Sequence, residues 1–241
     1  MQIPGVTPLL NRLRFEGRGR QCPVCGQESR RFAAFGRPRR EEARCGWCSS
    51  LERHRLVWLY LEQRSGLFDG AERRVLHVAP EPCLEAQLRA RLGKGYVTAD
   101  FSNPDADVRM DITAIQYPEQ TFDFIYCSHV LEHVTDDRQA MREFHRVLRR
   151  DGTAVLLVPI ALDQPKTFED PNVSDPRERE RLFGQRDHVR RYGRDYVDRL
   201  REAGFSVEVL TANDLTTAQN IDRMRLTEAA GQIHVCRRVG G

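Results

Sequence analysis

Short apolar runs alternate with amphipathic stretches from Arg74 to the end of the chain. Runs of this length, bounded by turn residues, are typical of buried strands, and the stretches between them have the period of helices. Strands that alternate with crossover helices form a parallel sheet, so we expect an α/β domain. The pattern predicts strands at Arg74–Val78, Tyr96–Ala99, Phe122–Ile125, Thr153–Val158, Ser206–Leu210 and Ile233–Cys236, with a short one through Val108.

Two helices are also predicted by the pattern. Asp136–Arg149 places apolar side chains on one stripe, and Gly152 follows where a C′ glycine ends a helix. Further upstream, Ser49–Glu52 fits an S-x-x-E capping box and predicts a helix that runs to Gln63 and ends before Gly66. The stripe consists of Ala140, Met141, Phe144, Val147 and Leu148.

These elements predict a small domain followed by a large one. We place the boundary near residue 70, because the α/β pattern begins just after it. This gives a small N-terminal domain at 1–50, a linking helix at 51–70 and the α/β domain at 71–241, with an insertion at 161–195.

The composition is that of a soluble globular protein. Hydrophobic residues make up 40% of the 241 and charged residues 30%, and no apolar run approaches the roughly 20 residues that cross a bilayer. The first ten residues lack the basic and apolar regions of a secretory signal. We therefore expect a cytoplasmic protein with no membrane partner.

Positive charge is concentrated at the front of the chain. The net charge is +3, but residues 1–60 contain 12 Arg and 5 Glu, a net +7, so the remainder carries −4. A basic segment of this kind indicates nucleic acid or another anionic partner. The alternative is a genome-wide preference for arginine, since Lys94 and Lys166 are the only lysines in the sequence.

Four cysteines in the basic segment have the spacing of a metal site. They form two C-x-x-C pairs with 19 residues between them: Cys22 with Cys25, and Cys45 with Cys48. One glycine follows the second cysteine and another follows the third. Four thiolates complete the closed tetrahedral shell of a structural Zn²⁺ ion. A disulfide or a redox pair is the alternative, but a cytosolic setting disfavours the first and duplication disfavours the second.

Two segments of the α/β domain resemble a known enzyme family. Residues Phe122–Val134 read FDFIYCSHVLEHV, and residues Arg146–Thr153 read RVLRRDGT. They are similar to the F-D-x-V-x-x-x-x-x-L-E-H-V and R-V-L-K-P-G-G patterns of class I S-adenosylmethionine-dependent methyltransferases of type 11. The resemblance covers roughly Val75–Arg238. It implies a Rossmann-like sheet of seven strands and S-adenosylmethionine as the methyl donor.

Acidic residues follow the predicted second and third strands. Ligands of open α/β sheets bind at the carboxyl ends of the strands. Asp100 ends the second strand, where its carboxylate can accept hydrogen bonds from both ribose hydroxyls of a bound adenosine. The resemblance implies cofactor contacts for residues after strands two to four: Asp111 and Ile112 at the adenine, Cys127 and Ser128 beside the methionine moiety, and Phe101 and His133 nearby.

The first loop departs from the family pattern. The family has D/E-x-G-x-G-x-G there, whereas His77–Cys83 contains no glycine, and two prolines stiffen it. Ala79 is the smallest replacement for the first glycine, with Pro80 beside it. Glu81 could pair with the α-ammonium group of the cofactor.

Histidines provide the candidate bases for methyl transfer. An imidazole has the pKa suited to removing a proton from a hydroxyl or ammonium acceptor. His129 and His188 are our candidates, and His133 ranks below them because it is expected to pack within its loop.

In the insertion, Arg186, Arg190 and Tyr192 are candidates for acceptor recognition. The alternative is a solvated helix at Pro176–Arg181 with a flexible loop.

We expect a methyltransferase that acts on a small polar metabolite, natural product or sugar. The first alternative is an RNA methyltransferase whose basic zinc knuckle binds nucleic acid, although the N/D-P-P-Y motif of many exocyclic amine methylases is absent. The second is a descendant of the fold that does not methylate, which the missing glycines suggest.

Overall fold

The computed structural model describes residues 6–238, which form two compact units. The first contains the chain up to Asp69 together with Glu81–Arg91 and Leu210–Gln232. The second contains Gly70–Pro80, Leu92–Val209 and the residues from Ile233 onward. A linear boundary near residue 70 therefore separates only part of the first unit, because two later segments pack with it.

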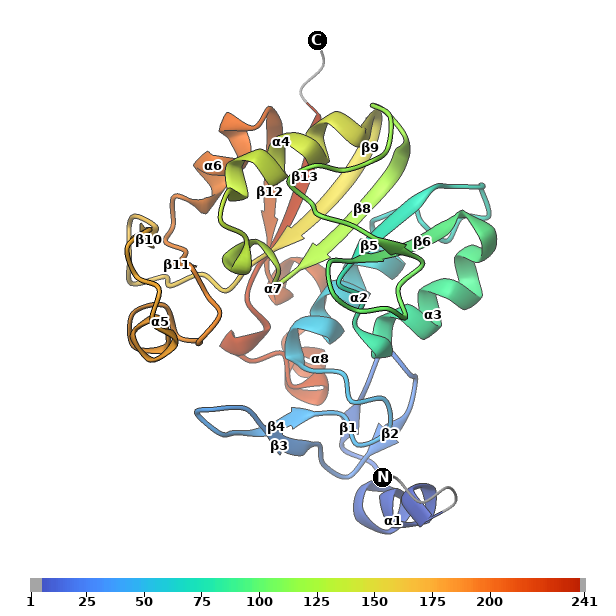
Figure 1. The fold of residues 1–241 in the computed structure, drawn as a ribbon. Helices are drawn as coiled ribbons and strands as arrows, with labels where there is room; N and C mark the ends of the chain where they lie inside the picture. The colour runs from blue at the N-terminus through green and yellow to red at the C-terminus, as the bar shows by residue number, and fades with distance from the viewer. Residues whose placement is uncertain (1–5, 239–241) are drawn as a thin grey trace. The chain divides into compact units, whose positions relative to one another are not determined.

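A seven-stranded sheet forms the centre of the second unit (Figure 1), in the order β12-β13-β9-β8-β5-β6-β7. Strands β5 to β9 run parallel, and β13 is antiparallel to β9. All seven predicted strands and the Rossmann-like fold are thereby confirmed. The bounds are β5 Val75–Val78, β6 Tyr96–Asp100, β7 Val108–Arg109, β8 Phe122–Ser128, β9 Leu148–Leu157, β12 Phe205–Leu210 and β13 Ile233–Arg238.

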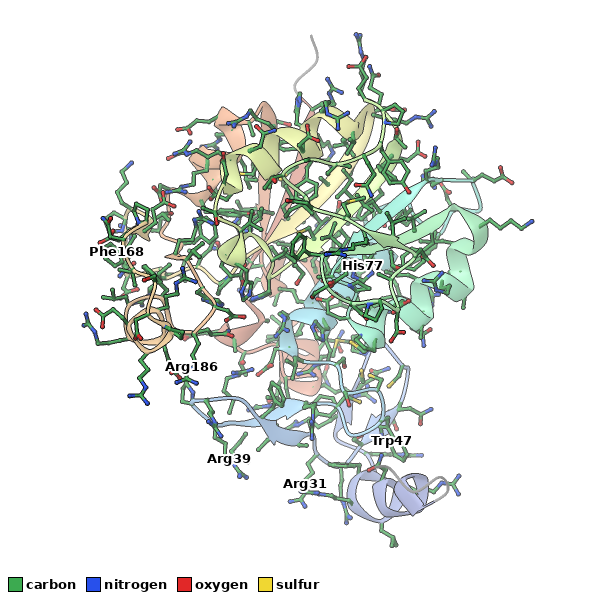
Figure 2. The ribbon with its side chains drawn as sticks, viewed as in Figure 1. Arg31, Arg39, Trp47, His77, Phe168 and Arg186 are labelled. Carbon is green, nitrogen blue, oxygen red and sulfur yellow. The ribbon has the colours of Figure 1, made fainter. Side chains whose placement is uncertain are left out.

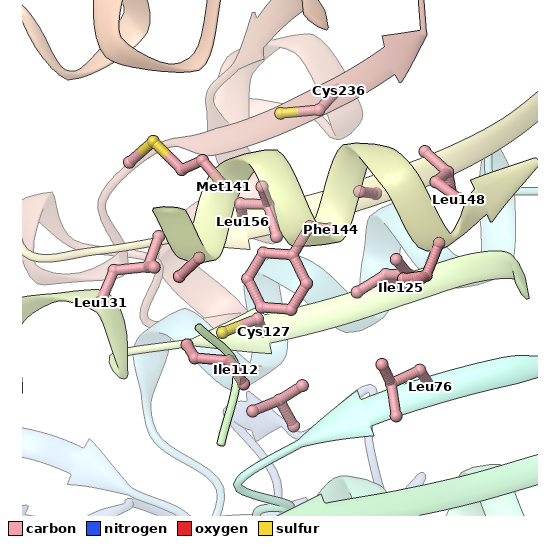
Figure 3. Close-up of a cluster of buried hydrophobic side chains, with 14 of the residues drawn as sticks. Leu76, Ile112, Ile125, Cys127, Leu131, Met141, Phe144, Leu148, Leu156 and Cys236 are labelled. Atoms are coloured by element: carbon pink, nitrogen blue, oxygen red, sulfur yellow. The ribbon is translucent and has the colours of Figure 1, made fainter. Parts of the chain in front are cut away.

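The main core of the second unit lies between the sheet and α4 (Asp137–Val147), which presents the predicted apolar stripe. Asp136 caps the helix by accepting a hydrogen bond from the amide of Gln139 at 2.8 Å. Figure 3 shows Phe144 between this helix and the strand that carries Ile125, and the phenyl ring is completely buried. Burying a side chain of this size contributes roughly 1.5–3 kcal/mol.

The predicted end of α4 was wrong. The helix stops at Val147, and Leu148 already begins β9, so Gly152 lies inside a strand and is not a C′ residue. The register between β8 and β9 shifts at this place. A Cβ atom on Gly152 would lie 3.0 Å from the carbonyl oxygen of Asp123, so glycine permits this close approach of two strands.

The insertion folds as a small structured element of the second unit. Strands β10 (Phe168–Glu169) and β11 (Arg190–Arg191) form an antiparallel pair, with α5 (Pro176–Phe183) between them. Helix α6 (Tyr196–Glu202) follows. Two short 3₁₀ turns lie elsewhere in the chain: η1 (Gly93–Gly95) before β6, and η2 (Leu131–His133) after β8.

The first unit consists of short strands and several helices. Within residues 6–238, no helix of either unit combines the length and apolar character of a membrane span. The elements are α1 Val6–Phe15, β1 Arg20–Gln21, β2 Glu28–Ser29, β3 Ala33–Phe35, β4 Arg40–Arg44, α2 Glu52–Gln63, α3 Pro82–Leu92, α7 Ala212–Leu215, α8 Ala218–Met224 and η3 Glu228–Ala230.

Helix α2 is the core of the first unit, and not merely a linker. Its residues from Leu56 to Leu61 are all buried. Arg55 is also completely buried, and its guanidinium donates to the carbonyl oxygens of Ala43, Ser50 and Met224. This one side chain therefore joins the cysteine-rich segment to α8.

The predicted capping box at the start of α2 does not form. Leu51 is the N-cap, and its amide donates to Nδ1 of His54 at 3.1 Å. The neighbouring Ser50 contacts the cysteine cluster, with its hydroxyl 3.1 Å from Sγ of Cys22. Of the two residues expected to cap the helix, Ser49 has its amide hydrogen-bonded to the carbonyl oxygen of Cys45, and Glu52 pairs with Arg40.

Candidate functional site

The carboxyl ends of five parallel strands meet at one edge of the sheet. β5 lies at the switch point, because it pairs with β6 on one side and β8 on the other. The amide of Ala79 donates to the carbonyl oxygen of Ala99 at 2.8 Å, and that of His129 donates to Leu157 at 2.8 Å. The loops after neighbouring strands are thus held side by side, as a ligand site of this fold requires.

Asp100 and Asp111 are held in the same manner at this edge. Oδ1 of Asp100 accepts hydrogen bonds from the amides of Ser102 and Asn103, both at 2.7 Å. Oδ1 of Asp111 accepts from the amide and hydroxyl of Thr113. Each carboxylate therefore shapes its own turn with one oxygen and retains Oδ2, for which the described residues supply no hydrogen bond.

Two residues at the strand ends have left-handed backbones. Ala79, after β5, has φ +50°, and His129, after β8, has φ +56°. Such angles favour glycine and cost other residues of order 1–3 kcal/mol. The glycine-free loop thus keeps the conformation that a glycine would adopt.

The other expected cofactor residues have different environments. Cys127 and Ile112 belong to the buried core, and Figure 3 shows both there. Ser128 is buried and its hydroxyl has no hydrogen-bond partner in the described part of the chain. Phe101 is 63% exposed, so its ring is free to meet a ligand. In the first unit, Glu81 has Oε1 at 3.6 Å from Nε2 of His54.

A cluster of polar side chains follows β8. The 3₁₀ turn η2 (Leu131–His133) carries Glu132, which is 1% exposed, and His133. Potential ligand atoms of Glu132, His133 and His188 all lie within 4.8 Å of one another. His129 approaches the same carboxylate, with Nδ1 at 3.3 Å from Oε1. We did not predict Glu132, because it is hidden in the family-like L-E-H-V motif.

Arg190 and Tyr192 do not have the places expected of acceptor-binding residues. Both are buried: Arg190 donates to the carbonyl oxygens of Leu131 and Thr135, and the Tyr192 hydroxyl donates to Asp137 at 2.6 Å. Burial, with the neighbouring Asp137 charge, raises the pKa of Tyr192 well above its usual value. We therefore assign these two residues to holding the insertion in place.

An ion network completes this anchor. Arg199 donates to Asp137 at 3.0 Å and to Glu169 at 2.7 Å, and Arg190 also pairs with Glu169. Burial alone would lower the pKa of Arg199, but these two carboxylates outweigh it and raise that pKa. Of the three residues expected to bind the acceptor, only Arg186, which is labelled in Figure 2, is exposed. Its Nε lies 3.3 Å from Oε2 of Glu180.

The four cysteines of the first unit are gathered in one place. Sγ of Cys22 lies 3.6 Å from that of Cys48, and Sγ of Cys25 lies 3.9 Å from that of Cys45. Disulfide sulfurs would be about 2.05 Å apart. Tetrahedral Zn–S bonds of about 2.3 Å place the sulfurs about 3.8 Å apart, so the cluster has the dimensions of a four-thiolate zinc site.

Comparison with known proteins identifies the second unit. Residues 70–156 match the family described as "Methyltransferase domain". This part of the second unit resembles a methyltransferase domain. The match begins before β5 and ends within β9, so it includes the strand ends that carry Ala79, Asp100 and Ser128, and it supports the predicted class of enzyme.

Relatives of the methyltransferase domain include YcgJ of Bacillus subtilis (strain 168), an uncharacterized methyltransferase. It is 36% identical over 59 residues, which are 24% of this chain and 23% of that protein. The structure of an S-adenosylmethionine-dependent methyltransferase from Mesorhizobium loti superposes with a TM-score of 0.52 at 18% identity, covering 79% of this chain and all of that one. The latter similarity concerns the fold.

Proposed function

We propose that the protein transfers the methyl group of S-adenosylmethionine to a small polar acceptor. The adenosine would lie at the carboxyl edge of β5, β6 and β7, where Oδ2 of Asp100 and Oδ2 of Asp111 are available. Phe101 offers an exposed ring to the adenine, and the hydroxyl of Ser128 offers a polar contact to the methionine moiety.

The observation that carries this proposal is the pairing of Ala79 with Ala99. A left-handed Ala79, hydrogen-bonded at 2.8 Å to the residue before Asp100, gives the backbone after β5 the conformation that a glycine would adopt there. The missing glycines are therefore compatible with cofactor binding. Glu81 has a histidine partner in the first unit, so we do not include it among the cofactor contacts.

Methyl transfer requires a nucleophile in line with the sulfonium. The acceptor atom forms a bond to the methyl carbon as the carbon–sulfur bond breaks, and S-adenosylhomocysteine leaves. A proton on the acceptor passes to a base, for which His129 is our candidate because it ends β8 and its ring is about one-third exposed. His188 is a weaker candidate, because it is buried and its Nδ1 is already hydrogen-bonded.

An RNA acceptor is the second candidate. The first unit contains a cavity of about 350 Å³ lined by Arg14, Arg39 and Arg44 beside Cys45 and Gly46. Figure 2 labels Arg39 among the exposed side chains. Phosphate contacts would make RNA affinity fall steeply with added salt. Absence of RNA binding at about 50 mM salt would remove this candidate.

We also propose that Cys22, Cys25, Cys45 and Cys48 hold one structural Zn²⁺ ion. With four protein ligands the ion has no open position for catalysis, so it would stabilise the fold of the first unit. Ser50, whose hydroxyl is 3.1 Å from Sγ of Cys22, and the amide of Trp47, 3.4 Å from Sγ of Cys45, would support the thiolates.

Titration of the full chain with S-adenosylhomocysteine tests the proposed activity before any acceptor is known. Saturable binding is expected. No binding at millimolar concentration would favour a descendant of the fold that does not methylate.

A further inference from the structure

The carboxylate of Glu132 is buried without a hydrogen bond. Its side chain is 1% exposed, and neither Oε1 nor Oε2 has a hydrogen-bond partner within the described residues. Removing a carboxylate from water without such partners costs several kcal/mol unless a positive charge compensates it. A cation beside Glu132 would compensate its buried charge, and the surrounding groups indicate which kind.

His188 has the environment of a metal ligand. Its ring is 4% exposed, and Nδ1 lies 3.1 Å from the carbonyl oxygen of Phe183. A carbonyl oxygen can only accept, so Nδ1 carries the proton and Nε2 presents a lone pair. Nε2 is buried and lacks a partner in the described part of the chain. Metal-binding histidines are commonly oriented by such a backbone carbonyl.

His133 is oriented by a carboxylate. Its Nδ1 lies 3.2 Å from Oδ2 of Asp187, and its ring packs edge-on against His188 with centroids 4.7 Å apart. A proton on Nδ1 faces Asp187, which leaves Nε2 as the lone pair. Two imidazoles whose Nδ1 protons point away from Glu132 thus stand beside a carboxylate that has no hydrogen bond among the described residues.

We propose that Glu132, His133 and His188 bind one divalent transition-metal ion. Potential ligand atoms of all three lie within 4.8 Å of one another. Imidazole nitrogens with a carboxylate suit Mn²⁺, Fe²⁺, Co²⁺ or Zn²⁺ better than Mg²⁺ or Ca²⁺, which prefer oxygen ligands. Three protein ligands leave coordination positions open, unlike the closed four-cysteine site.

The place of this site gives the ion a role, which rests on the methyltransferase activity proposed above. Glu132 stands four residues after Ser128, at the end of β8, where the methyl donor is expected. An open coordination position there would bind a hydroxyl of the acceptor, lower its pKa and hold its oxygen for attack. The inference therefore specifies an oxygen acceptor, whose proton would pass to His129, the residue with Nδ1 3.3 Å from Oε1 of Glu132.

A protonated His129 is the competing source of positive charge. Its Nδ1 is 3.3 Å from Oε1 of Glu132, yet the two atoms are not hydrogen-bonded, and the ring is 32% exposed. That ion pair would leave Nε2 of His188 without a partner. A metal ion satisfies both groups together.

The test is a titration with Mn²⁺ of the full chain that carries one equivalent of zinc, enough for the four-cysteine site alone. Binding is followed by the electron paramagnetic resonance signal of free Mn²⁺. Neither methyl donor nor acceptor is present, so failure here leaves the proposed activity standing, and failure to bind S-adenosylhomocysteine leaves the metal site standing. We expect one tight Mn²⁺ per chain. Glu132→Gln and His188→Gln should each weaken binding at least tenfold, and Asp187→Asn about 10–100-fold.

His145→Gln is the matched control, because His145 packs against Phe205, is not among the three ligands, and should leave Mn²⁺ affinity unchanged. Asp187 is exposed, so its variant tests the site even if a buried substitution prevents folding. Absence of tight Mn²⁺ binding, or wild-type affinity in either Glu132→Gln or His188→Gln, would overturn the proposal. Wild-type affinity in Asp187→Asn would overturn it as well.

Discussion

The amide of Ala79 donates a hydrogen bond to the carbonyl oxygen of Ala99 at 2.8 Å, with Ala79 in a left-handed conformation. This pairing fixes the path of the chain between β5 and the turn at Asp100. It shows how a loop with prolines and no glycine can follow a course that glycines usually permit. The predictions below begin with this residue.

Substitutions of Ala79 should reveal its left-handed backbone. A valine there should lower the free energy of unfolding by more than about 1 kcal/mol, since a β-branched residue tolerates positive φ poorly. Glycine should change it by about 0–1 kcal/mol in the stabilising direction, because relief of strain is partly offset by a more flexible unfolded chain. Urea denaturation measures both. A neutral valine variant would contradict the assigned conformation.

Metal analysis of the purified protein should find one equivalent of zinc at the four-cysteine cluster. Cys45→Ser removes one thiolate and should lower the zinc content well below one equivalent. Cys236→Ser is the control: this thiol is also buried, but it lies in β13, outside the cluster, and its loss should leave the zinc content unchanged. A full equivalent of zinc in Cys45→Ser would refute the four-thiolate site.

Removing the charge of Asp137 should strongly destabilise the second unit. Asp137→Asn leaves the buried guanidiniums of Arg190 and Arg199 with less compensation, and breaking a buried pair costs about 3–5 kcal/mol. Glu178→Gln, which removes an exposed pair with Arg181, should have no measurable effect. Thermal unfolding compares the two. Equal melting temperatures would contradict the network's role in anchoring the insertion.

Acid should destabilise the protein partly through His234. This histidine is 1% exposed, neither ring nitrogen has a partner among the described residues, and burial lowers its pKa to about 4. The unfolded chain takes up this proton near pH 6.5, so stability is full above pH 6.5 and declines as the pH falls toward 4. The loss amounts to about 3 kcal/mol.

His234→Phe keeps an aromatic ring beside Tyr196, whose centroid lies 5.0 Å away, and removes the titration. Its unfolding free energy should therefore fall less steeply than that of the wild type between pH 6.5 and 4. Parallel pH profiles for the two proteins would show that His234 is not buried as a neutral group.

The seven strands were predictable from sequence because each buried strand is a short apolar run between polar turns. The end of α4 was not, because Leu148 continues the apolar stripe of the helix while belonging to β9. The three segments that make up the first unit were not predictable, for a different reason. Arg55 joins the N-terminal part of this unit to Met224, and no local pattern indicates a contact between residues so far apart.

The candidate site was predictable only where one residue marks the end of a strand. Asp100 and Ser128 end β6 and β8, and Asp111 lies two residues after β7, and the sequence pattern indicates these positions directly. The cluster of Glu132 and His188 depends on the folding of the insertion, which returns His188 to η2 through the hydrogen bond from the amide of Val189 to Glu132. Arg190 and Tyr192 were misassigned because sequence alone does not distinguish a buried anchor from a ligand contact.

The most direct test of the central claim is calorimetric titration of S-adenosylhomocysteine into the wild type, Asp100→Asn and Asp198→Asn. Asparagine at position 100 retains the oxygen that accepts from Ser102 and Asn103, so the turn should survive while the charge is lost. Asp198 is exposed in α6, away from the strand ends, and serves as the control. We predict that Asp100→Asn weakens binding by about 1–3 kcal/mol, roughly 5–150-fold, and that Asp198→Asn leaves it unchanged. Equal affinities of all three proteins, or no binding to the wild type, would contradict the claim that adenosine lies at Asp100.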